Sequence, residues 1–103
     1  MSSPTQRTLA LLRDEGYLAD VVEKWIPGAN VRKDLWGWCD IVAIRDNTTY
    51  AIQCTSDSNV AARVEKIEDS DTIAVVRRAG WKVEVWGWKK VKNRWRVRKV
   101  DVS

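Results

Sequence analysis

The chain has 103 residues and a formal net charge of +4, and this length supports one domain, residues 1–103, with a single modest core. Two Cys and no His exclude an ordinary zinc site, and seven Trp with no Phe mean that buried aromatic side chains bring N–H groups that need hydrogen-bond partners. No signal peptide, membrane-length apolar run or lipidation motif is visible, so we expect a cytoplasmic protein with no membrane partner.

A helix and a strand open the chain. Ser3 followed by Pro4 is typical of a helix N-cap and first turn, and Gly16 is expected to end that helix. Residues 18–26 alternate in the manner of one strand, and the Pro-Gly pair at 27–28 closes it.

A loop and a β-hairpin follow. Residues 27–35 form the longest irregular segment, which we interpret as a substrate loop that carries Arg32, Lys33 and Asp34, with Arg32 and Lys33 as nucleic-acid contacts. Residues 40–44 and 50–55 predict two adjacent strands, joined by an Asp-Asn-Thr-Thr turn.

The second half of the chain predicts two helices and a second hairpin. The first helix is capped by Asp57 or Ser58, and a shorter helix runs through residues 73–77 to a stop at Gly80. Strands at 81–91 and 94–102 end the chain. The order αβββα(α)ββ predicts an α/β (α+β) domain with a mixed central β-sheet flanked by helices.

Polar side chains stand where the first hairpin should be apolar. If its strands pair, Asp40 lies beside Gln53, and Gln53 shares a face with Thr55. Taken alone, Asp40 could cap a turn and Gln53 could bond a buried backbone group. Together, such oxygen-bearing groups at a sheet edge suit a divalent-metal phosphodiester hydrolase.

The residues Gly37-x-x-Asp40 and Gln53-x-Thr55 resemble the motif of the PD-(D/E)xK nuclease superfamily. The longer runs Gln53-Cys54-Thr55-Ser56 and Trp81-Lys82-Val83-Glu84-Val85-Trp86-Gly87-Trp88 are similar to small phage and bacterial members with a QxTS variant of that motif. The resemblance implies a restriction-endonuclease-like fold. It also implies a cytoplasmic location in a bacterium or a phage-infected host cell.

The resemblance implies roles for individual residues. Asp40 and Gln53 would hold Mg²⁺ or Mn²⁺, and Gln53 stands where the superfamily has Asp or Glu. Thr55 occupies the place of the superfamily lysine, where its hydroxyl would orient the attacking water. The missing cation would come from Lys33, Arg63 or Lys66.

Two further acids are candidate catalytic residues. Glu15 lies in the last turn of the first expected helix, where the helix dipole disfavours a carboxylate. A place near the metal would explain that position. Glu23, in the strand over residues 18–26, is the second candidate.

The charge is distributed unevenly. Residues 1–76 carry 8 Lys and Arg against 12 Asp and Glu, whereas residues 77–103 carry 10 against 2. This basic quarter indicates a surface for a polyanion, although a merely solvated hairpin has the same composition. The expected nucleic-acid contacts, which include a phosphate site at a helix N-terminus, are Arg32, Lys33, Ser56, Ser58, Asn59, Arg63, Lys66, Arg94, Arg96 and Arg98.

These features predict a magnesium-dependent DNA endonuclease or resolvase-like hydrolase that is structure-selective or non-specific. A homodimer is expected, because so small a domain covers little of a duplex. Two alternatives remain open: a catalytically inactive nucleic-acid-binding module of the same fold, and a protein-interaction subunit with exposed Trp side chains.

Overall fold

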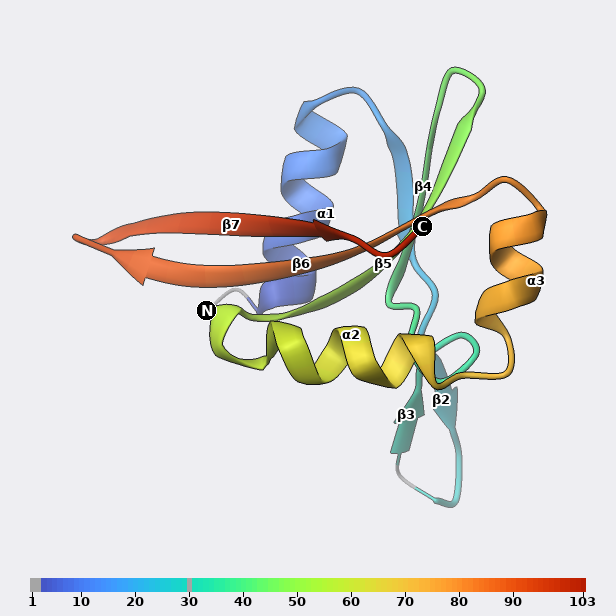
Figure 1. Cartoon of the computed structure of the whole chain (residues 1–103). Helices are drawn as coiled ribbons and strands as arrows, with labels where there is room; N and C mark the ends of the chain where they lie inside the picture. The colour runs from blue at the N-terminus through green and yellow to red at the C-terminus, as the bar shows by residue number, and fades with distance from the viewer. Residues whose placement is uncertain (1–2, 30) are drawn as a thin grey trace.

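A computed structural model of the chain describes residues 3–29 and 31–103, with the side chains of Lys24, Trp25 and Arg32 also outside the described part. The chain is an α+β domain built on a five-stranded mixed sheet with helices packed on it, which confirms the predicted class (Figure 1). The sheet has the order β1-β4-β5-β6-β7, with β1 Leu18–Val21, β4 Ile41–Arg45, β5 Thr48–Ser56, β6 Lys82–Val91 and β7 Arg94–Asp101.

The first helix, α1 (Pro4–Asp14), begins and ends as the sequence predicts. The Ser3 hydroxyl accepts a hydrogen bond from the backbone N–H of Gln6 at 3.2 Å, which satisfies one of the free donors of the first turn. Gly16 has φ +91°, a conformation that glycine adopts at little cost, and there the chain leaves the helix.

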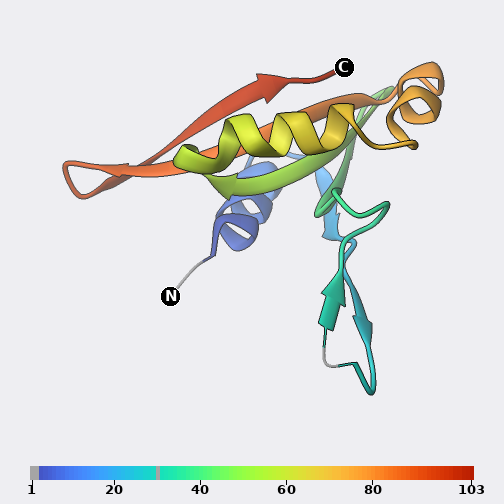
Figure 2. The ribbon, with the colours of Figure 1, turned by 60° about the horizontal axis from the view of Figure 1, so that its bottom comes forward.

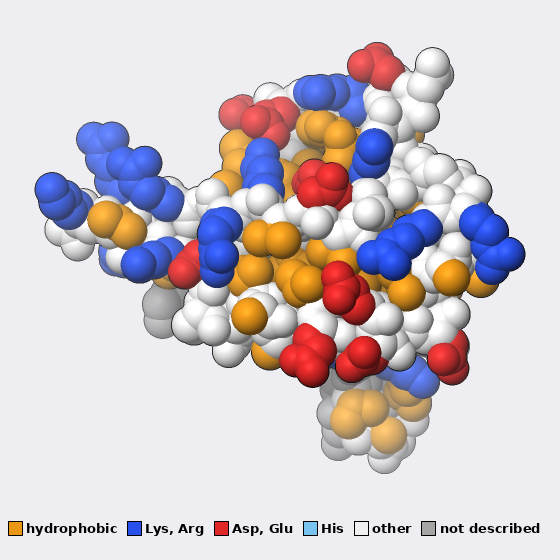
Figure 3. Space-filling view, viewed as in Figure 1, with side chains coloured by type: hydrophobic (Ala, Val, Ile, Leu, Met, Phe, Trp, Pro, Cys, Tyr) orange, Lys and Arg blue, Asp and Glu red, His pale blue; other side chains and the backbone are white. Residues whose placement is uncertain are grey.

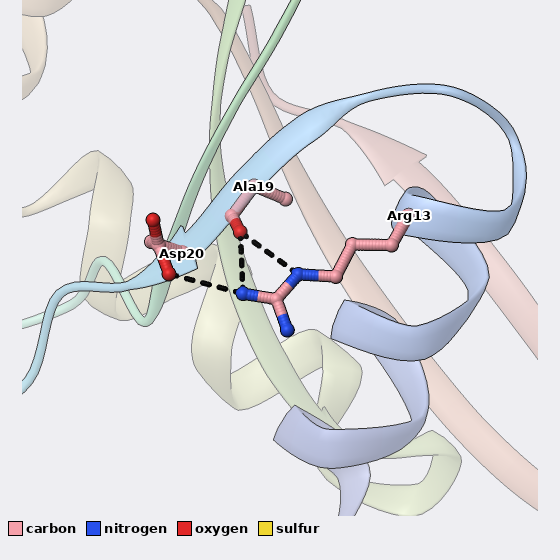
Figure 4. Close-up of polar contacts among 3 residues, drawn as sticks. All are labelled: Arg13, Ala19 and Asp20. Carbon is pink, nitrogen blue, oxygen red and sulfur yellow. Dashed lines mark hydrogen bonds and ion pairs between the residues drawn. The ribbon is translucent and has the colours of Figure 1, made fainter.

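Arg13 links the end of α1 to the first strand through hydrogen bonds. Arg13 donates to the backbone carbonyl of Ala19 at 3.1 and 2.9 Å and to the Asp20 carboxylate at 3.0 Å (Figure 4). This contact holds the C-terminal end of α1 beside β1.

The hairpin of β4 and β5 is confirmed, with a shorter turn than expected. Ile41 faces Ile52 and Arg45 faces Thr48, so only Asp46 and Asn47 remain as the turn. Asp46 has φ +55°, which Asp tolerates in a tight hairpin turn.

The prediction of one strand over residues 18–26 is wrong. β1 ends at Val21, because β4, its antiparallel partner, begins opposite at Ile41. The chain continues as β2 (Lys24–Ile26), which pairs with β3 (Val31–Lys33) in a separate two-stranded sheet. Much of the expected irregular segment over residues 27–35 is therefore a hairpin, which projects from the body of the domain (Figure 2).

Two helices connect β5 to β6, which run parallel. They are α2 (Val60–Glu68), preceded by the 3₁₀ turn η1 (Asp57–Asn59), and α3 (Ile73–Arg78). The predicted cap at Asp57 or Ser58 is wrong, because the chain first forms η1 and α2 then begins after Asn59 without a side-chain cap.

Each face of the sheet carries its own buried cluster. On one face α1 contributes Leu9 and Leu12, and on the other α2 and α3 contribute Val60, Ile67 and Val76. Figure 2 shows α1 and α2 on opposite sides of the sheet. The clusters bury most of the apolar surface that stabilises the domain.

The buried Trp side chains find partners for their N–H groups, as their chemistry requires. Trp38 donates to the Thr72 hydroxyl at 2.9 Å, and Trp88 donates to the Thr8 hydroxyl at 2.8 Å. The basic hairpin predicted at the end of the chain is also confirmed, with Lys92-Asn93 as the turn between β6 and β7. Among the described residues, no helix is long and apolar enough to cross a membrane.

Candidate metal centre

Asp40 and Gln53 are in direct contact, as the hairpin register predicts. The backbone N–H of Asp40 bonds the carbonyl of Ile52 at 2.9 Å, which continues the β4–β5 ladder by one residue. Gln53 Nε2 then donates to Asp40 Oδ2 at 2.8 Å. The backbone N–H of Cys54 donates to the same oxygen, also at 2.8 Å.

These polar groups are buried and incompletely satisfied. Asp40 is 4% exposed and Gln53 is 3% exposed. Gln53 Oε1 is buried and has no hydrogen-bond partner among the described residues. Because a buried polar atom without a partner costs free energy, native proteins retain few of them, and most have a functional or solvent explanation.

Two more carboxylates join Asp40. Glu23, between β1 and β2, and Asp34, after β3, each offer a carboxylate oxygen, and the oxygens of the three acids lie within 4.8 Å of one another. We call Glu23, Asp34 and Asp40 the acidic group. The backbone carbonyl of Asp40 also accepts the N–H of Val22 at 2.9 Å, which brings the neighbouring Glu23 to the site.

A small loop explains how Asp34 reaches Asp40. Leu35 and Cys39 form an antiparallel bridge, and Trp36 and Gly37 make the turn with φ +59° and +80°. Residues that flank such a bridge on both sides face each other, so positions 34 and 40 are opposed. The sequence signal for this role of Asp34 is therefore the Trp-Gly turn midway between two aspartates; Asp34 was expected in the substrate loop and not as a metal ligand.

Burial raises the pKa of the Asp40 carboxyl to about 7. The Cys54 N–H acts in the opposite direction, because it stabilises the charged form, whereas the negative charges of Asp34 and Glu23 raise the pKa further. The site therefore disfavours three ionised carboxylates unless a positive charge is present.

An open pocket of about 360 Å³ lies against this site. Asp34 and Lys33 line it together with Trp36 and with the apolar side chains of Val22, Ile26 and Leu35. Trp36 is 38% exposed and packs against the rings of Trp38 and Trp81 at 5.8 and 5.7 Å. Asp34 is thus the residue of the acidic group that the pocket reaches.

The other expected catalytic residues fall in different places. Thr55 is 6% exposed and shares the α2 side of the sheet with Gln53, two positions along β5. Glu15 is not brought to the site: its backbone carbonyl accepts from Arg45 at 3.0 Å, at the opposite end of β4 from Asp40. Proximity to the candidate metal site therefore does not explain why an acid stands at this end of α1.

The expected nucleic-acid residues come from several elements. Lys33 lies at the pocket, whereas the Arg32 side chain lies outside the described residues. Arg98 bonds Asp57 at 2.9 Å. Along α2, Arg63 is half-buried and Lys66 is exposed. Arg94 and Arg96 are exposed in β7, and the polar side chains at the start of η1 bond one another: Ser56, Ser58 and Asn59.

The thiol groups of the two cysteines take no part in the acidic group. Cys39 is free and buried in the cluster on the α2 side, and Cys54 is free and buried on the α1 side. Burial raises the pKa of both thiols, that of Cys39 to about 12. Both therefore remain protonated at neutral pH and behave as small apolar residues.

The scan of the chain against protein-family models gave no match, and the search among curated proteins gave none either.

Proposed function

We propose that the chain is a metal-dependent endonuclease that hydrolyses phosphodiester bonds in DNA. The observation that carries the proposal is the convergence of Glu23, Asp34 and Asp40 from three separate segments, within 4.8 Å, beside a buried amide oxygen of Gln53 without a partner. Three carboxylates so close together repel one another, and a divalent cation that takes their oxygens as ligands would offset this repulsion.

The donor set fits a hard divalent cation. Carboxylate oxygens are the ligands that Mg²⁺ and Mn²⁺ prefer, and an amide oxygen is an acceptable fourth. Asp40 and Asp34 would hold the cation, with Glu23 and Gln53 Oε1 as further ligands. The cation would supply Lewis acidity to offset the charge of a phosphodiester.

The chain's own residues account for the remaining tasks. The hydroxyl of Thr55, on the face of Gln53, would accept or donate one hydrogen bond to orient a water molecule. Lys33 lines the pocket beside Asp34 and is the best placed of the three cations considered for the role of the superfamily lysine. Burial of Asp40 strengthens each electrostatic contact made there.

The element order supports the same proposal. A helix, three antiparallel strands, a helix and a parallel strand, here α1, β1, β4, β5, α2 and β6, are the order expected of a restriction-endonuclease-like core. We propose that fold for the chain. Asp40 at the start of its second strand and Gln53 in its third then correspond to the two acidic positions of the superfamily motif.

A second function is favoured by one observation. Gln53 and Thr55 are neutral where the superfamily motif has an acid and a lysine, so the same fold would also serve as a binding module without cleavage. The basic C-terminal quarter suits either function, because phosphate contacts do not depend on hydrolysis.

One assay separates the two functions. Labelled duplex, single-stranded and branched DNA are incubated with the protein in EDTA, Mg²⁺ or Mn²⁺, beside Asp40→Asn. Asp20→Asn is the matched control, because Asp20 is an exposed aspartate on β1 paired with Arg13. We expect cation-dependent cleavage by wild type and Asp20→Asn and none by Asp40→Asn. Binding without cleavage in every cation would contradict the nuclease and support the module.

A further inference from the structure

The end of the β6–β7 hairpin extends past the rest of the sheet (Figures 1 and 2). β5 accompanies β6 only as far as Ser56, which pairs with Trp88, and β7 is the edge strand of the described sheet. Beyond that point, residues 89–91 face residues 94–96 in a two-stranded ribbon closed by the turn at 92–93. We call residues 89–96 the basic arm.

The basic arm carries five cationic residues and no acidic one. Facing residues of a ribbon share a side, so Lys89, Arg94 and Arg96 lie on the α2 side and Lys90 lies with Trp95 on the α1 side. Lys92 is in the turn. In Figure 3, Lys and Arg side chains gather on this projecting part of the hairpin. Cations therefore occupy both sides of the ribbon.

Two contacts brace the basic arm, one on each side: one is made by Trp95, in the middle residue pair of the arm, and the other by Arg98, just before its base. The Arg7 guanidinium of α1 stacks 3.4 Å from the centroid of the Trp95 ring. On the other side, Arg98 forms an ion pair with Asp57 of η1 at 2.9 Å. These contacts fix the direction in which the arm leaves the domain.

The dimensions and charge of the arm match one groove of duplex DNA. Three residue pairs at ~3.3 Å each give a ribbon about 10 Å long, and the major groove is about 8.5 Å deep and 12 Å wide. A ribbon that enters tip first turns its two sides toward the two phosphate backbones that border the groove. By contrast, a ribbon that lay along a single phosphate backbone would need cations only on the side that faces this backbone.

We infer that the basic arm inserts into the major groove of duplex DNA, with cations on each side facing one backbone and Lys92 and Asn93 at the groove floor. This inference rests on the proposed action on DNA, and it specifies that the protein binds double-stranded DNA. Arg94 and Arg96 lie on the α2 side of the sheet, the side that also carries the buried Gln53 and Thr55.

Binding without catalysis tests the arm. Fluorescence anisotropy in EDTA compares wild type with Arg94→Gln/Arg96→Gln for a labelled duplex. The matched control is Arg78→Gln/Lys82→Gln, which removes the same two charges from α3 and from the other end of β6. We expect the arm variant to bind at least tenfold more weakly than the control, and its salt slope to fall by about 1.8, at ~0.9 per lost phosphate contact. Equal affinity of the two variants would overturn the inference.

Groove-specific probes test the mode of insertion. A duplex with glucosylated 5-hydroxymethylcytosine fills the major groove and is expected to bind wild type at least tenfold more weakly, whereas netropsin in the minor groove leaves the affinity unchanged. Duplex RNA of the same sequence, whose major groove is deep and narrow, is also expected to bind weakly. Unchanged affinity for the glucosylated duplex, or equal affinity for duplex RNA or single-stranded DNA, would contradict insertion.

The two proposals fail separately. Arm-dependent binding in EDTA with no cleavage in Mg²⁺ or Mn²⁺ contradicts the nuclease and supports the arm. Cleavage that the arm variant retains in full, with unchanged affinity, contradicts the arm and supports the nuclease.

Discussion

Gly87 of β6 lies directly beneath Val60 at the start of α2, so close that a Cβ atom at position 87 would overlap Val60 Cγ2 and meet the Asp57 backbone at 3.0 Å. Thr55 is the β5 residue that pairs with Gly87. The close approach thus places the start of α2 over the face that carries Thr55 and Gln53.

Gly87→Ala is expected to lower the free energy of unfolding by about 1–3 kcal/mol, because the added methyl group forces α2 away from the sheet. Urea unfolding measures this cost. In a Val60→Ala background, where the overlapping atom is gone, the same substitution should cost less. Equal costs in the two backgrounds would contradict the proposed overlap.

The acidic group predicts a pH dependence for the metal-free protein. The pKa of Asp40 is about 7 in the folded chain against an ordinary value of 3.8, so between these values the folded state retains a proton that the unfolded state has lost. The free energy of unfolding should therefore fall as pH rises from 4 to 7, by at most about 1.4 kcal/mol per pH unit. Urea unfolding in EDTA at several pH values measures this slope.

Asp40→Asn provides the control for that slope. The amide does not titrate, so the decline between pH 4 and 7 should flatten. A decline of the same size in the variant would assign the pH dependence to other groups.

Gln53→Glu places a further acid beside Asp40, in contact with the acidic group. A fourth carboxylate should raise the affinity for Mg²⁺ about tenfold or more, because charge count governs affinity at such sites. In EDTA it should destabilise the fold by about 1–3 kcal/mol, since another buried charge is added. Thermal unfolding with and without Mg²⁺ measures both effects, and Gln53→Met tests the loss of the amide alone. A Gln53→Glu protein with unchanged cation affinity would argue against Gln53 as a ligand.

Trp88→Phe tests why the chain uses Trp in place of Phe. The substitution removes the hydrogen bond to the Thr8 hydroxyl, which itself donates to the carbonyl of Pro4 at 2.8 Å. We expect a loss of about 1–3 kcal/mol in the free energy of unfolding, because a buried hydroxyl loses a partner. Thr8→Val completes a double-mutant cycle, and a coupling energy near zero would contradict the contact.

The fold follows from the sequence where local patterns agree with the tertiary pairing. Ser3 and Gly16 mark α1 correctly, and both long hairpins were predicted. The prediction of one strand over residues 18–26 was wrong. The alternating pattern continues past Val21, but the pairing with β4 ends there, at Ile41. Strand length is decided by the partner, and a single segment's pattern does not contain that information.

The sequence predicted the part of the site that depends on the pairing register of the β4–β5 hairpin. Asp40 and Gln53 were expected to be neighbours because both belong to one hairpin. Asp34 and Glu23 arrive from separate segments, and their convergence depends on the loop between Leu35 and Cys39 and on the bend after β1. Glu15 was proposed on its local helix position alone, and the direction of α1 places it at the other end of β4.

The most direct test of the proposed metal centre is a titration of the metal-free protein with Mn²⁺, monitored by calorimetry or electron paramagnetic resonance. We expect one Mn²⁺ per wild-type chain, the same for Asp20→Asn, and at least tenfold weaker binding for both Asp40→Asn and Asp34→Asn. Wild type that binds Mn²⁺ no more tightly than Asp40→Asn would contradict a cation site at the acidic group.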